Sequence, residues 1–146
     1  PSRMAGVSGL PMVQALRHDS GAPLVLEGGG IETDGRGTML VTEEWLLSDV
    51  QVRNPGYTRA DYERAFADYL GISKTIWLGE GCVGDDTHGH IDDIARFVAP
   101  GVMVLAHETN PDDENHARSL DNLQRLEGVT DARGEPIRVV TLPYPR

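Results

Sequence analysis

The pattern of the chain is set by Gly37-Thr38-Met39-Leu40-Val41, which is matched further along by Gly101-Val102-Met103-Val104-Leu105. At the same offset, Lys74-Thr75-Ile76-Trp77-Leu78 is matched by Arg138-Val139-Val140-Thr141-Leu142. Apolar runs of this length, rich in β-branched residues, are typical of strands. A helical pattern lies between the two runs of each copy. The sequence therefore predicts two copies of a unit with the order strand, strand, helix, strand, and such self-similarity suggests modules stacked around an axis.

The first copy is predicted to open with a hairpin. Residues 31–33 and 37–42 flank Asp34-Gly35, a pair that favours a tight turn between antiparallel strands. Two shorter strands, at residues 12–16 and 23–26, are predicted ahead of it.

The helix of the first copy has recognisable ends. Thr58 can cap its start, Asp61 stands in the capping-box position, and Gly71 ends it. Its predicted apolar face consists of Tyr62, Phe66, Tyr69 and Leu70.

The second copy is predicted to follow the same order. Residues 94–98 and 102–106 form a hairpin across Pro100-Gly101, and residues 137–142 form the last strand. We expect Asn110 to cap the intervening helix, with Pro111 in its first turn. The predicted apolar stripe of this helix is Ala117, Leu120, Leu123 and Leu126.

Composition limits what the chain can bind. Its 146 residues include 23 acidic and 13 basic ones, a formal net charge of −10, which disfavours nucleic acid and anionic membranes and favours cationic small molecules. The single cysteine excludes an intrachain disulfide, and the apolar runs are too short to cross a bilayer. We expect a soluble, cytoplasmic protein. Because Pro1 stands where an initiator methionine is usual, we also expect a partial sequence.

The densest group of reactive side chains is Gly84-Asp85-Asp86-Thr87-His88-Gly89-His90-Ile91-Asp92-Asp93. Four crowded carboxylates repel one another unless a cation lies among them, and imidazoles exchange protons near neutral pH. The stretch is therefore a candidate site for a metal ion or a positively charged substrate.

A second candidate group is Glu27, which precedes three glycines, residues 28–30. Glycines leave little steric cover, so a ligand or another part of the backbone can approach the carboxylate. An acidic residue in a glycine-rich turn explains the pattern equally well. The predicted hairpin after the glycines excludes a dinucleotide-binding fingerprint, which requires a helix there.

One explanation of the dense stretch is a zinc site. Thr87-His88-Gly89-His90-Ile91-Asp92 resembles the HxHxDH motif of metallo-β-lactamase-fold hydrolases. However, Asp93 stands where that motif has its last histidine, and His18, His107 and His116 show no matching ligand spacing. A zinc-dependent hydrolase is therefore the weaker alternative.

Several motifs occur together in the order found in one family. They are residues 26–31 with Asp34-Gly35, residues 37–44, Arg53-Asn54-Pro55, residues 69–71, residues 76–78, and residues 84–97 with Pro100-Gly101. In this combination the chain resembles the agmatine deiminase and Porphyromonas-type peptidylarginine deiminase family of the pentein, or guanidino-group-modifying, superfamily. The resemblance implies an α+β fold of pentein-type αβ-propeller modules, five in the family. About two are expected here, a partial domain spanning residues 1–146 with modules at residues 22–80 and 87–143.

The resemblance also implies a chemistry, the hydrolysis of agmatine or a related guanidino compound to a ureido product and ammonia, without a metal or other cofactor. Asp92 would bind the planar, charged guanidinium, for which a carboxylate is a natural partner. His90 would act as the general acid and then as the base. Glu27 would hold the imidazole or a guanidinium nitrogen. We expect four remaining groups to cap loops or face solvent: His88, Asp85, Asp86 and Asp93.

The family attacks its substrate with a cysteine thiolate near the C-terminus, in a segment that this sequence does not contain. Cys82 is the only thiol, and it lies in a loop where the family has no nucleophile. We therefore expect the chain to be inactive alone. Three classes of function stay open: part of a guanidine deiminase, a non-catalytic cation-binding or assembly protein of the same fold, and the zinc hydrolase.

The expected partners follow from the same reasoning. They are a cationic guanidino small molecule and, because two modules would leave apolar ends uncovered, either further copies of the chain or other segments of the same enzyme. No nucleic acid or membrane is expected.

Overall fold

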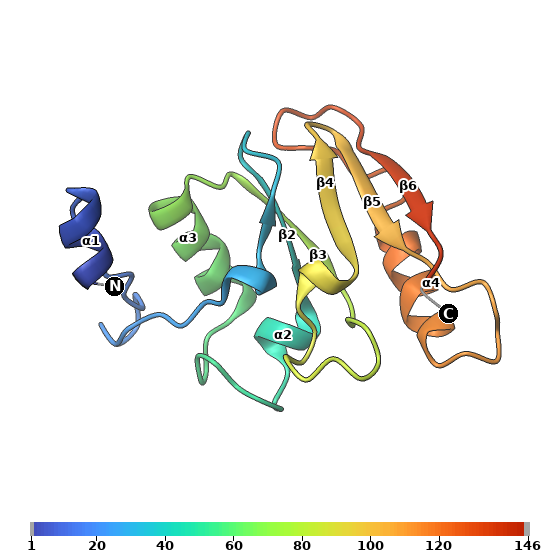
Figure 1. The fold of residues 1–146 in the computed structure, drawn as a ribbon, viewed down its shortest axis with the longest axis horizontal. Helices are drawn as coiled ribbons and strands as arrows, with labels where there is room; N and C mark the ends of the chain where they lie inside the picture. Colours follow the sequence, from blue (N-terminus) through green and yellow to red (C-terminus); the bar gives the residue numbers. More distant parts are fainter. Residues whose placement is uncertain (1, 145–146) are drawn as a thin grey trace.

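The computed structural model describes residues 2–144 and contains two small sheets with helices between their strands (Figure 1). Its elements, in chain order, are α1 (Ser2–Ser8), η1 (Gly28–Gly30), β1 (Glu32–Thr33), β2 (Thr38–Thr42), α2 (Glu43–Leu47), α3 (Arg59–Leu70), β3 (Lys74–Leu78), η2 (Ile91–Asp93), β4 (Ala95–Ala99), β5 (Val102–Ala106), α4 (Asn115–Arg125) and β6 (Arg138–Leu142). The fold is therefore mixed α and β. Among residues 2–144, no helix combines the length and the apolar character that crossing a membrane requires.

The two sheets have the same topology, with strand orders β1-β2-β3 and β4-β5-β6. In each sheet the first pair of strands is antiparallel and the second is parallel, with the helix in the crossover. Thr38 pairs with Lys74, and Val102 pairs with Arg138 at the same spacing. The predicted repeat of strand, strand, helix, strand is confirmed. The boundaries at residues 22–80 and 87–143, and a propeller of five such units, stay predictions.

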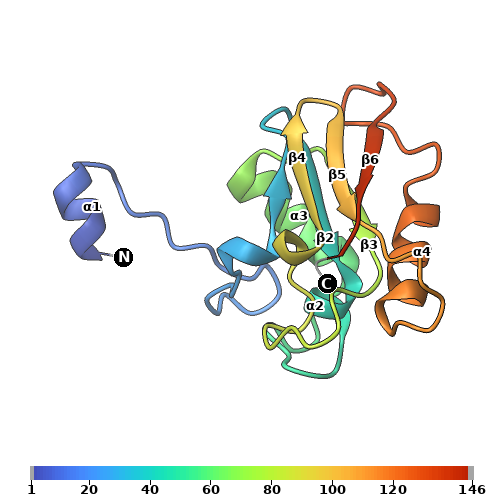
Figure 2. The same ribbon diagram turned by 45° about the vertical axis from the view of Figure 1, so that its right-hand side comes forward.

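The first sheet is covered on both faces. Because side chains alternate along a strand, Met39, Val41 and Trp77 share a core cluster with α3, on one face. Leu40, Ile76 and Leu78 share the other cluster with residues of the second unit, on the opposite face. Figures 1 and 2 show the first sheet between α3 and the second unit. The shared core joins the two units into one body.

Helix α3 begins and ends as predicted. The Thr58 side chain accepts a hydrogen bond from the Asp61 amide, the Asp61 side chain accepts one from the Thr58 amide, and Gly71 is left-handed at φ 69°. Its predicted apolar face is only half buried. Tyr62 and Phe66 are fully buried, whereas Tyr69 and Leu70 are among the exposed apolar residues. The buried face instead includes Ala65.

The two strands predicted at residues 12–16 and 23–26 are not formed. One isolated bridge, between Leu16 and Pro23, is present instead. Side chains hold this segment against the first unit: the Tyr69 hydroxyl bonds the Leu16 backbone, and the Asn54 amide bonds both backbone groups of Val25. Helix α1 lies away from the rest of the chain in both ribbon views (Figures 1 and 2).

The predicted start of the second helix is wrong. Asn110 forms a turn, in which its side chain accepts from the Asp112 amide, and α4 begins only at Asn115. The predicted apolar stripe is wrong in part, because Ala117 and Leu120 face solvent. The helix buries Ser119 and Asn122 instead, together with Leu126 at its C-cap.

The outer face of the second sheet has exposed apolar side chains and is uncovered in the described part of the chain. Val98, Val140 and Leu142 are 60%, 38% and 48% exposed. By the repeat, Val140 and Leu142 correspond to Ile76 and Leu78, which are 6% and 0% exposed because the second unit covers them. The same surface is thus buried in one unit and open in the next.

This difference predicts unequal costs for equivalent substitutions. Ile76→Ala should lower the free energy of unfolding by about 2–5 kcal/mol, because it leaves a cavity in the shared core. In the monomer, Val140→Ala should lower it by less than about 1 kcal/mol, because the side chain is already hydrated there. Urea unfolding of both variants, at a chain concentration too low for self-association, tests this. An equal cost at Val140 in the monomer would mean that the chain itself covers the outer face.

Candidate active site

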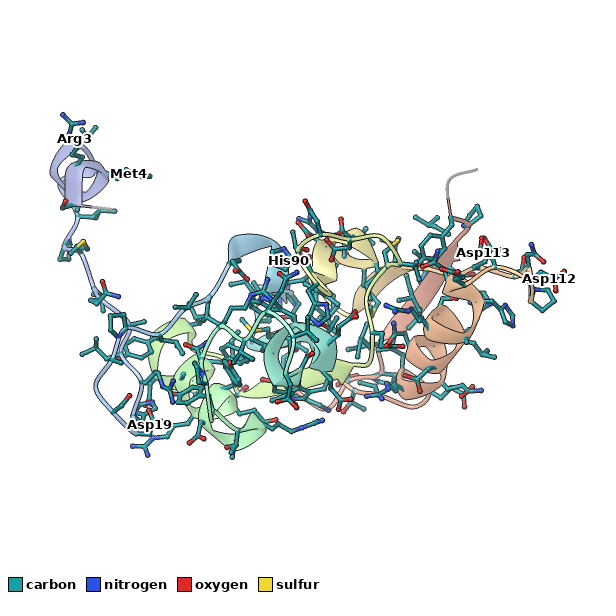
Figure 3. All side chains as sticks on the ribbon, turned by 90° about the horizontal axis from the view of Figure 1, so that it is seen from below. Arg3, Met4, Asp19, His90, Asp112 and Asp113 are labelled. Atoms are coloured by element: carbon teal, nitrogen blue, oxygen red, sulfur yellow. The ribbon has the colours of Figure 1, made fainter. Side chains whose placement is uncertain are left out.

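Glu27, His90 and Asp92 meet where the two short turns η1 and η2 touch. Glu27 is the residue before η1, His90 is the residue before η2, and Asp92 lies within η2. The Nε2 atom of His90 is 3.1 Å from Glu27 Oε2, and its Nδ1 atom is 4.0 Å from Asp92 Oδ1. Figure 3 shows His90 near the middle of the molecule, between these two turns. The fold therefore brings together three residues from distant parts of the sequence.

The Glu27 carboxylate is held by donors on both oxygens. Trp45 Nε1 donates to Oε2 at 2.5 Å, and Arg53 Nε lies 3.1 Å from each oxygen. Burial raises the pKa of Glu27, but the hydrogen bonds from Trp45, His90 and Arg53 outweigh it, so the pKa lies below its usual value. Glu27 is an ionised acceptor at neutral pH.

The contact with Glu27 determines which ring nitrogen of a neutral His90 carries the proton. Since the carboxylate can only accept, the imidazole must donate to it through Nε2. The Nδ1 atom is then the nitrogen with a free lone pair, and it is the one that faces Asp92. Trp45 closes another side, with its ring edge-on to the imidazole at a centroid distance of 5.6 Å. Proton exchange with a ligand is thus directed to Nδ1.

The three glycines after Glu27 have different surroundings. A Cβ atom on Gly29 would lie 2.7 Å from His90 Nδ1 and 2.8 Å from Asp92 Oδ2. On Gly30 it would lie 2.4 Å from the Trp45 ring, whereas on Gly28 it would meet nothing within 4 Å. The missing side chain of Gly29 leaves the space between the imidazole and the carboxylate open.

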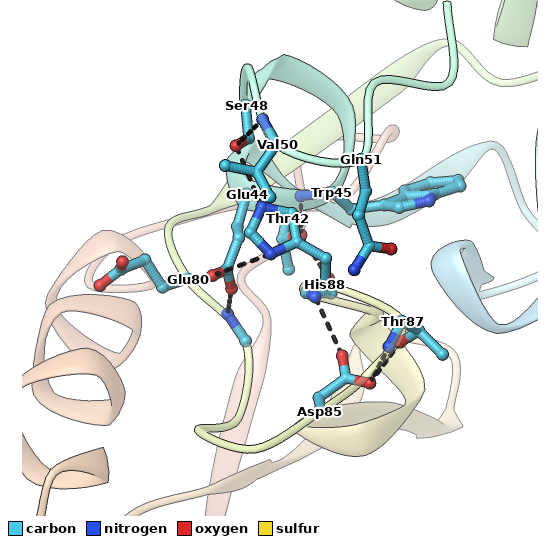
Figure 4. A network of polar contacts seen from close by, with 12 residues as sticks. Thr42, Glu44, Trp45, Ser48, Val50, Gln51, Glu80, Asp85, Thr87 and His88 are labelled. Atoms are coloured by element: carbon cyan, nitrogen blue, oxygen red, sulfur yellow. Dashed lines mark hydrogen bonds and ion pairs between the residues drawn. The ribbon is translucent and has the colours of Figure 1, made fainter.

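Asp85 organises the loop that leads to His90. Its Oδ1 atom accepts from the Thr87 amide at 2.7 Å and from the Thr87 hydroxyl at 2.5 Å. Its Oδ2 atom accepts from the amides of Gly89 and His90, at 2.9 and 3.1 Å. Burial raises the pKa of Asp85, but these donors outweigh it and lower the pKa. Asp85 is thus a loop cap (Figure 4).

His88 points away from His90. It has a left-handed φ of 62°, its Nε2 atom lies 3.0 Å from the Ser48 hydroxyl, and its Nδ1 atom lies 3.8 Å from Glu44 Oε1 (Figure 4). Across residues 2–144, no three side chains of His, Cys, Asp or Glu form a group that could hold a metal ion. The HxHxD stretch therefore does not converge as a zinc site would require.

The remaining acidic residues lie outside this group. Asp86 faces solvent. Cys82, Asp85, Asp93 and Tyr144 help to line a separate cavity of about 450 Å³. Burial, followed by the charges of Asp93 and Asp85, raises the pKa of the Cys82 thiol, and burial beside Asp85 and Asp92 raises the pKa of Asp93. A neutral, half-buried thiol is a poor nucleophile.

Two residues that contact the site were not predicted as part of it, Trp45 and Arg53. Trp45 lies in α2, directly after β2, where an aromatic residue is usually a core residue, and here it is both core and hydrogen-bond donor. Arg53 lies in a loop with turn-forming residues. In the sequence it belongs to Arg53-Asn54-Pro55, one of the motifs shared with the family, but nothing near it in the chain indicates a contact with Glu27.

Comparison with known proteins gives a consistent result. The model of the family described as Porphyromonas-type peptidyl-arginine deiminase matches residues 3–146. A candidate agmatine deiminase of Vibrio parahaemolyticus is 46% identical over 124 residues, which are 85% of this chain and 34% of that protein. The agmatine deiminase of Pseudomonas syringae is 43% identical over 121 residues, 83% of this chain and 32% of that protein.

The fold agrees with the same group of proteins. The solved structure of the agmatine deiminase of Enterococcus faecalis superposes with a TM-score of 0.84 at 33% identity, over 99% of this chain and 37% of that one. The chain spans about a third of the length of the curated relatives it matches. Since the family model covers nearly all of it, the chain belongs to the Porphyromonas-type peptidyl-arginine deiminase family.

Proposed function

We propose that this chain supplies the guanidinium-binding and acid–base part of an enzyme that hydrolyses agmatine, or a related guanidino compound, to a ureido product and ammonia. The observation that carries the proposal is the meeting of Glu27, His90 and Asp92 at η1 and η2. The agmatine deiminases among its relatives support the substrate class.

Asp92 is the proposed binder of the guanidinium. Its side chain is 38% exposed, and its Oδ1 atom lies 4.0 Å from His90 Nδ1, beyond hydrogen-bond range. In the described part of the chain, its oxygens therefore remain available to donors of a ligand. A carboxylate can accept two parallel N–H groups of a guanidinium, which fixes the plane of the central carbon.

His90 is the proposed acid and base, acting through Nδ1. When the carbon–nitrogen bond breaks, the protonated imidazole gives its Nδ1 proton to the departing nitrogen, which leaves as ammonia. The central carbon is then bonded to the sulfur of the attacking thiolate. When water attacks this carbon, Nδ1 takes a proton from the water, the carbon–sulfur bond breaks to release the thiolate, and the ureido oxygen is formed. Glu27, already ionised, stabilises the imidazolium through Nε2 in both steps. This arrangement favours Glu27 as the holder of the imidazole rather than of the guanidinium.

The attacking thiolate is assigned to a part of such an enzyme that these 146 residues do not span. Cys82 lines a different cavity and is held neutral by burial and by Asp93 and Asp85, so it is unsuited to the attack. The unsuitability of Cys82 as a nucleophile also favours one alternative, a protein of this fold that binds a guanidinium without reacting with it.

The proposal predicts binding without turnover. Agmatine should bind to the chain, and its NMR titration should shift the signals of His90 and Asp92, while no ammonia is released above the buffer rate. Cys82→Ser should change neither result. Ammonia release that disappears in Cys82→Ser would show that Cys82 is the nucleophile after all.

Gly28 and Gly29 provide a matched pair of substitutions. Neither has a left-handed φ, so alanine is tolerated by the backbone at both positions. Gly29→Ala should weaken agmatine binding about tenfold or more, because its methyl group occupies the space between His90 and Asp92. Gly28→Ala should bind as the unmodified chain does. Calorimetry compares the two, and equal affinities would place the ligand elsewhere.

We further propose that the uncovered face of the second sheet is an assembly surface. Its exposed valine and leucine side chains correspond to residues that are buried between the two units. Either another copy of the chain or another segment of the same enzyme would cover it.

Light scattering tests the first of these possibilities. At micromolar concentration the chain alone should show a mass above that of one copy, and Val140→Asp should reduce the mass to that of a monomer. Val50→Asp, a control in the loop after α2 where the side chain is 57% exposed, should leave the assembly intact. A stable monomer without substitution would rule out self-association through this face.

A further inference from the structure

Arg53 reaches the candidate site from the loop between α2 and α3. Its side chain is 9% exposed, and its Nε atom donates to the Glu27 carboxylate. Its Nη2 atom donates to the Thr87 carbonyl at 2.5 Å, and its Nη1 atom donates to the Gln51 carbonyl at 2.9 Å. One guanidinium therefore bonds both the carboxylate beside His90 and the loop that leads to His90.

We infer that Arg53 is a positioning residue, which fixes the Glu27 carboxylate against His90 and anchors residues 85–90 so that the imidazole faces Asp92. The inference rests on the proposed function in one respect, that His90 is the acid and base. It adds a residue whose contact with the site is through Glu27 and the Thr87 carbonyl.

The chemistry of the side chain matches this role. A guanidinium is planar and always charged, and it directs its N–H donors along fixed directions, so it can bond a carboxylate and two carbonyls at once. A lysine would place one charge near Glu27 but could not reproduce this geometry. The nearly complete burial of Arg53 also requires that its charge be compensated, which the Glu27 carboxylate does.

The loop that Arg53 anchors has a second support. Asp85 accepts from the Gly89 and His90 amides inside the loop, whereas Arg53 ties the Thr87 carbonyl to the rest of the molecule. Asp85 thus sets the shape of the loop, and Arg53 sets its place relative to Glu27. Both are needed if Nδ1 of His90 is to face Asp92.

Three variants of the chain test the inference without an activity assay. Arg53→Gln removes the charge and most donors, and Arg53→Lys keeps the charge but removes the planar geometry. Arg59→Gln is the control, because Arg59 also pairs with a glutamate, Glu43, but outside the site. For each variant, carbon-detected NMR follows the titration of the Glu27 carboxyl group, and hydrogen exchange follows the Gly89 and His90 amides.

In Arg53→Gln the pKa of Glu27 should rise, because a charged donor is lost, and the two amides should exchange about tenfold faster or more. In Arg53→Lys the amides should exchange faster while the Glu27 titration moves less. The control should change neither. A folded Arg53→Gln protein in which both measurements match the unmodified chain would overturn the inference. If that variant does not fold, unchanged amide exchange in Arg53→Lys would overturn it.

The two proposals can fail separately. If agmatine does not bind to the unmodified chain but Glu27 and the loop respond to the Arg53 variants, the proposed function fails and the positioning role stands. If agmatine binds and neither measurement responds, the positioning role fails alone.

Discussion

The burial of Ile91 in the core shared by the two units is the constraint on which the candidate site depends. Ile91 is fully buried with Leu40 and Leu78 of the first sheet and Met103 and Leu105 of the second. Burying such a side chain contributes about 1.5–3 kcal/mol. Because His90 and Asp92 are its chain neighbours, the same contact holds them beside η1. An apolar interaction thus positions the polar residues of the site.

The polar groups around the site fall into two kinds. Glu27 and Asp85 are carboxylates with several protein donors each, and hydrogen bonding lowers the pKa of both despite burial. The Asp92 side chain is as exposed as that of Glu27, 38% against 39%, but it lies beyond hydrogen-bond range of His90. The first kind makes the site rigid, and the second leaves a charge available to a cation. This division of roles is what a site for a charged planar ligand requires.

Much of the fold could be predicted because its signals are local. The strand runs repeat with the correct alternation, and Thr58, Asp61 and Gly71 act at the helix ends as such residues usually do. The start of α4 could not be predicted, because Asn110 has the same propensity for a turn as for a helix cap. The buried face of α4 could not be predicted from apolar spacing, because hydrogen bonds determine which face is buried. The Asn122 side chain donates to the Glu80 carbonyl and accepts from the Gly79 amide.

The sequence could indicate which residues of the candidate site lie together, but not their geometry. The family motifs indicate Glu27, His90 and Asp92, yet nothing local in the sequence shows that His88 turns away or that Nδ1 of His90 is the nitrogen left open. Those depend on a left-handed residue and on donors from α2 and the following loop, which only the folded chain brings near. The roles of Arg53 and Trp45 could not be predicted either, because the residues that they contact are distant in the sequence.

The edge-on contact of Trp45 with His90 also makes the site optically observable. Charged imidazoles quench indole fluorescence on contact, and the two rings lie 5.6 Å apart at 81°. The other tryptophan of the chain, Trp77, donates to Glu63 and stacks under Arg59, on the far side of the first sheet from the shared core. With Trp77 replaced by phenylalanine, the emission of the chain would therefore report the charge of one histidine, with no label attached.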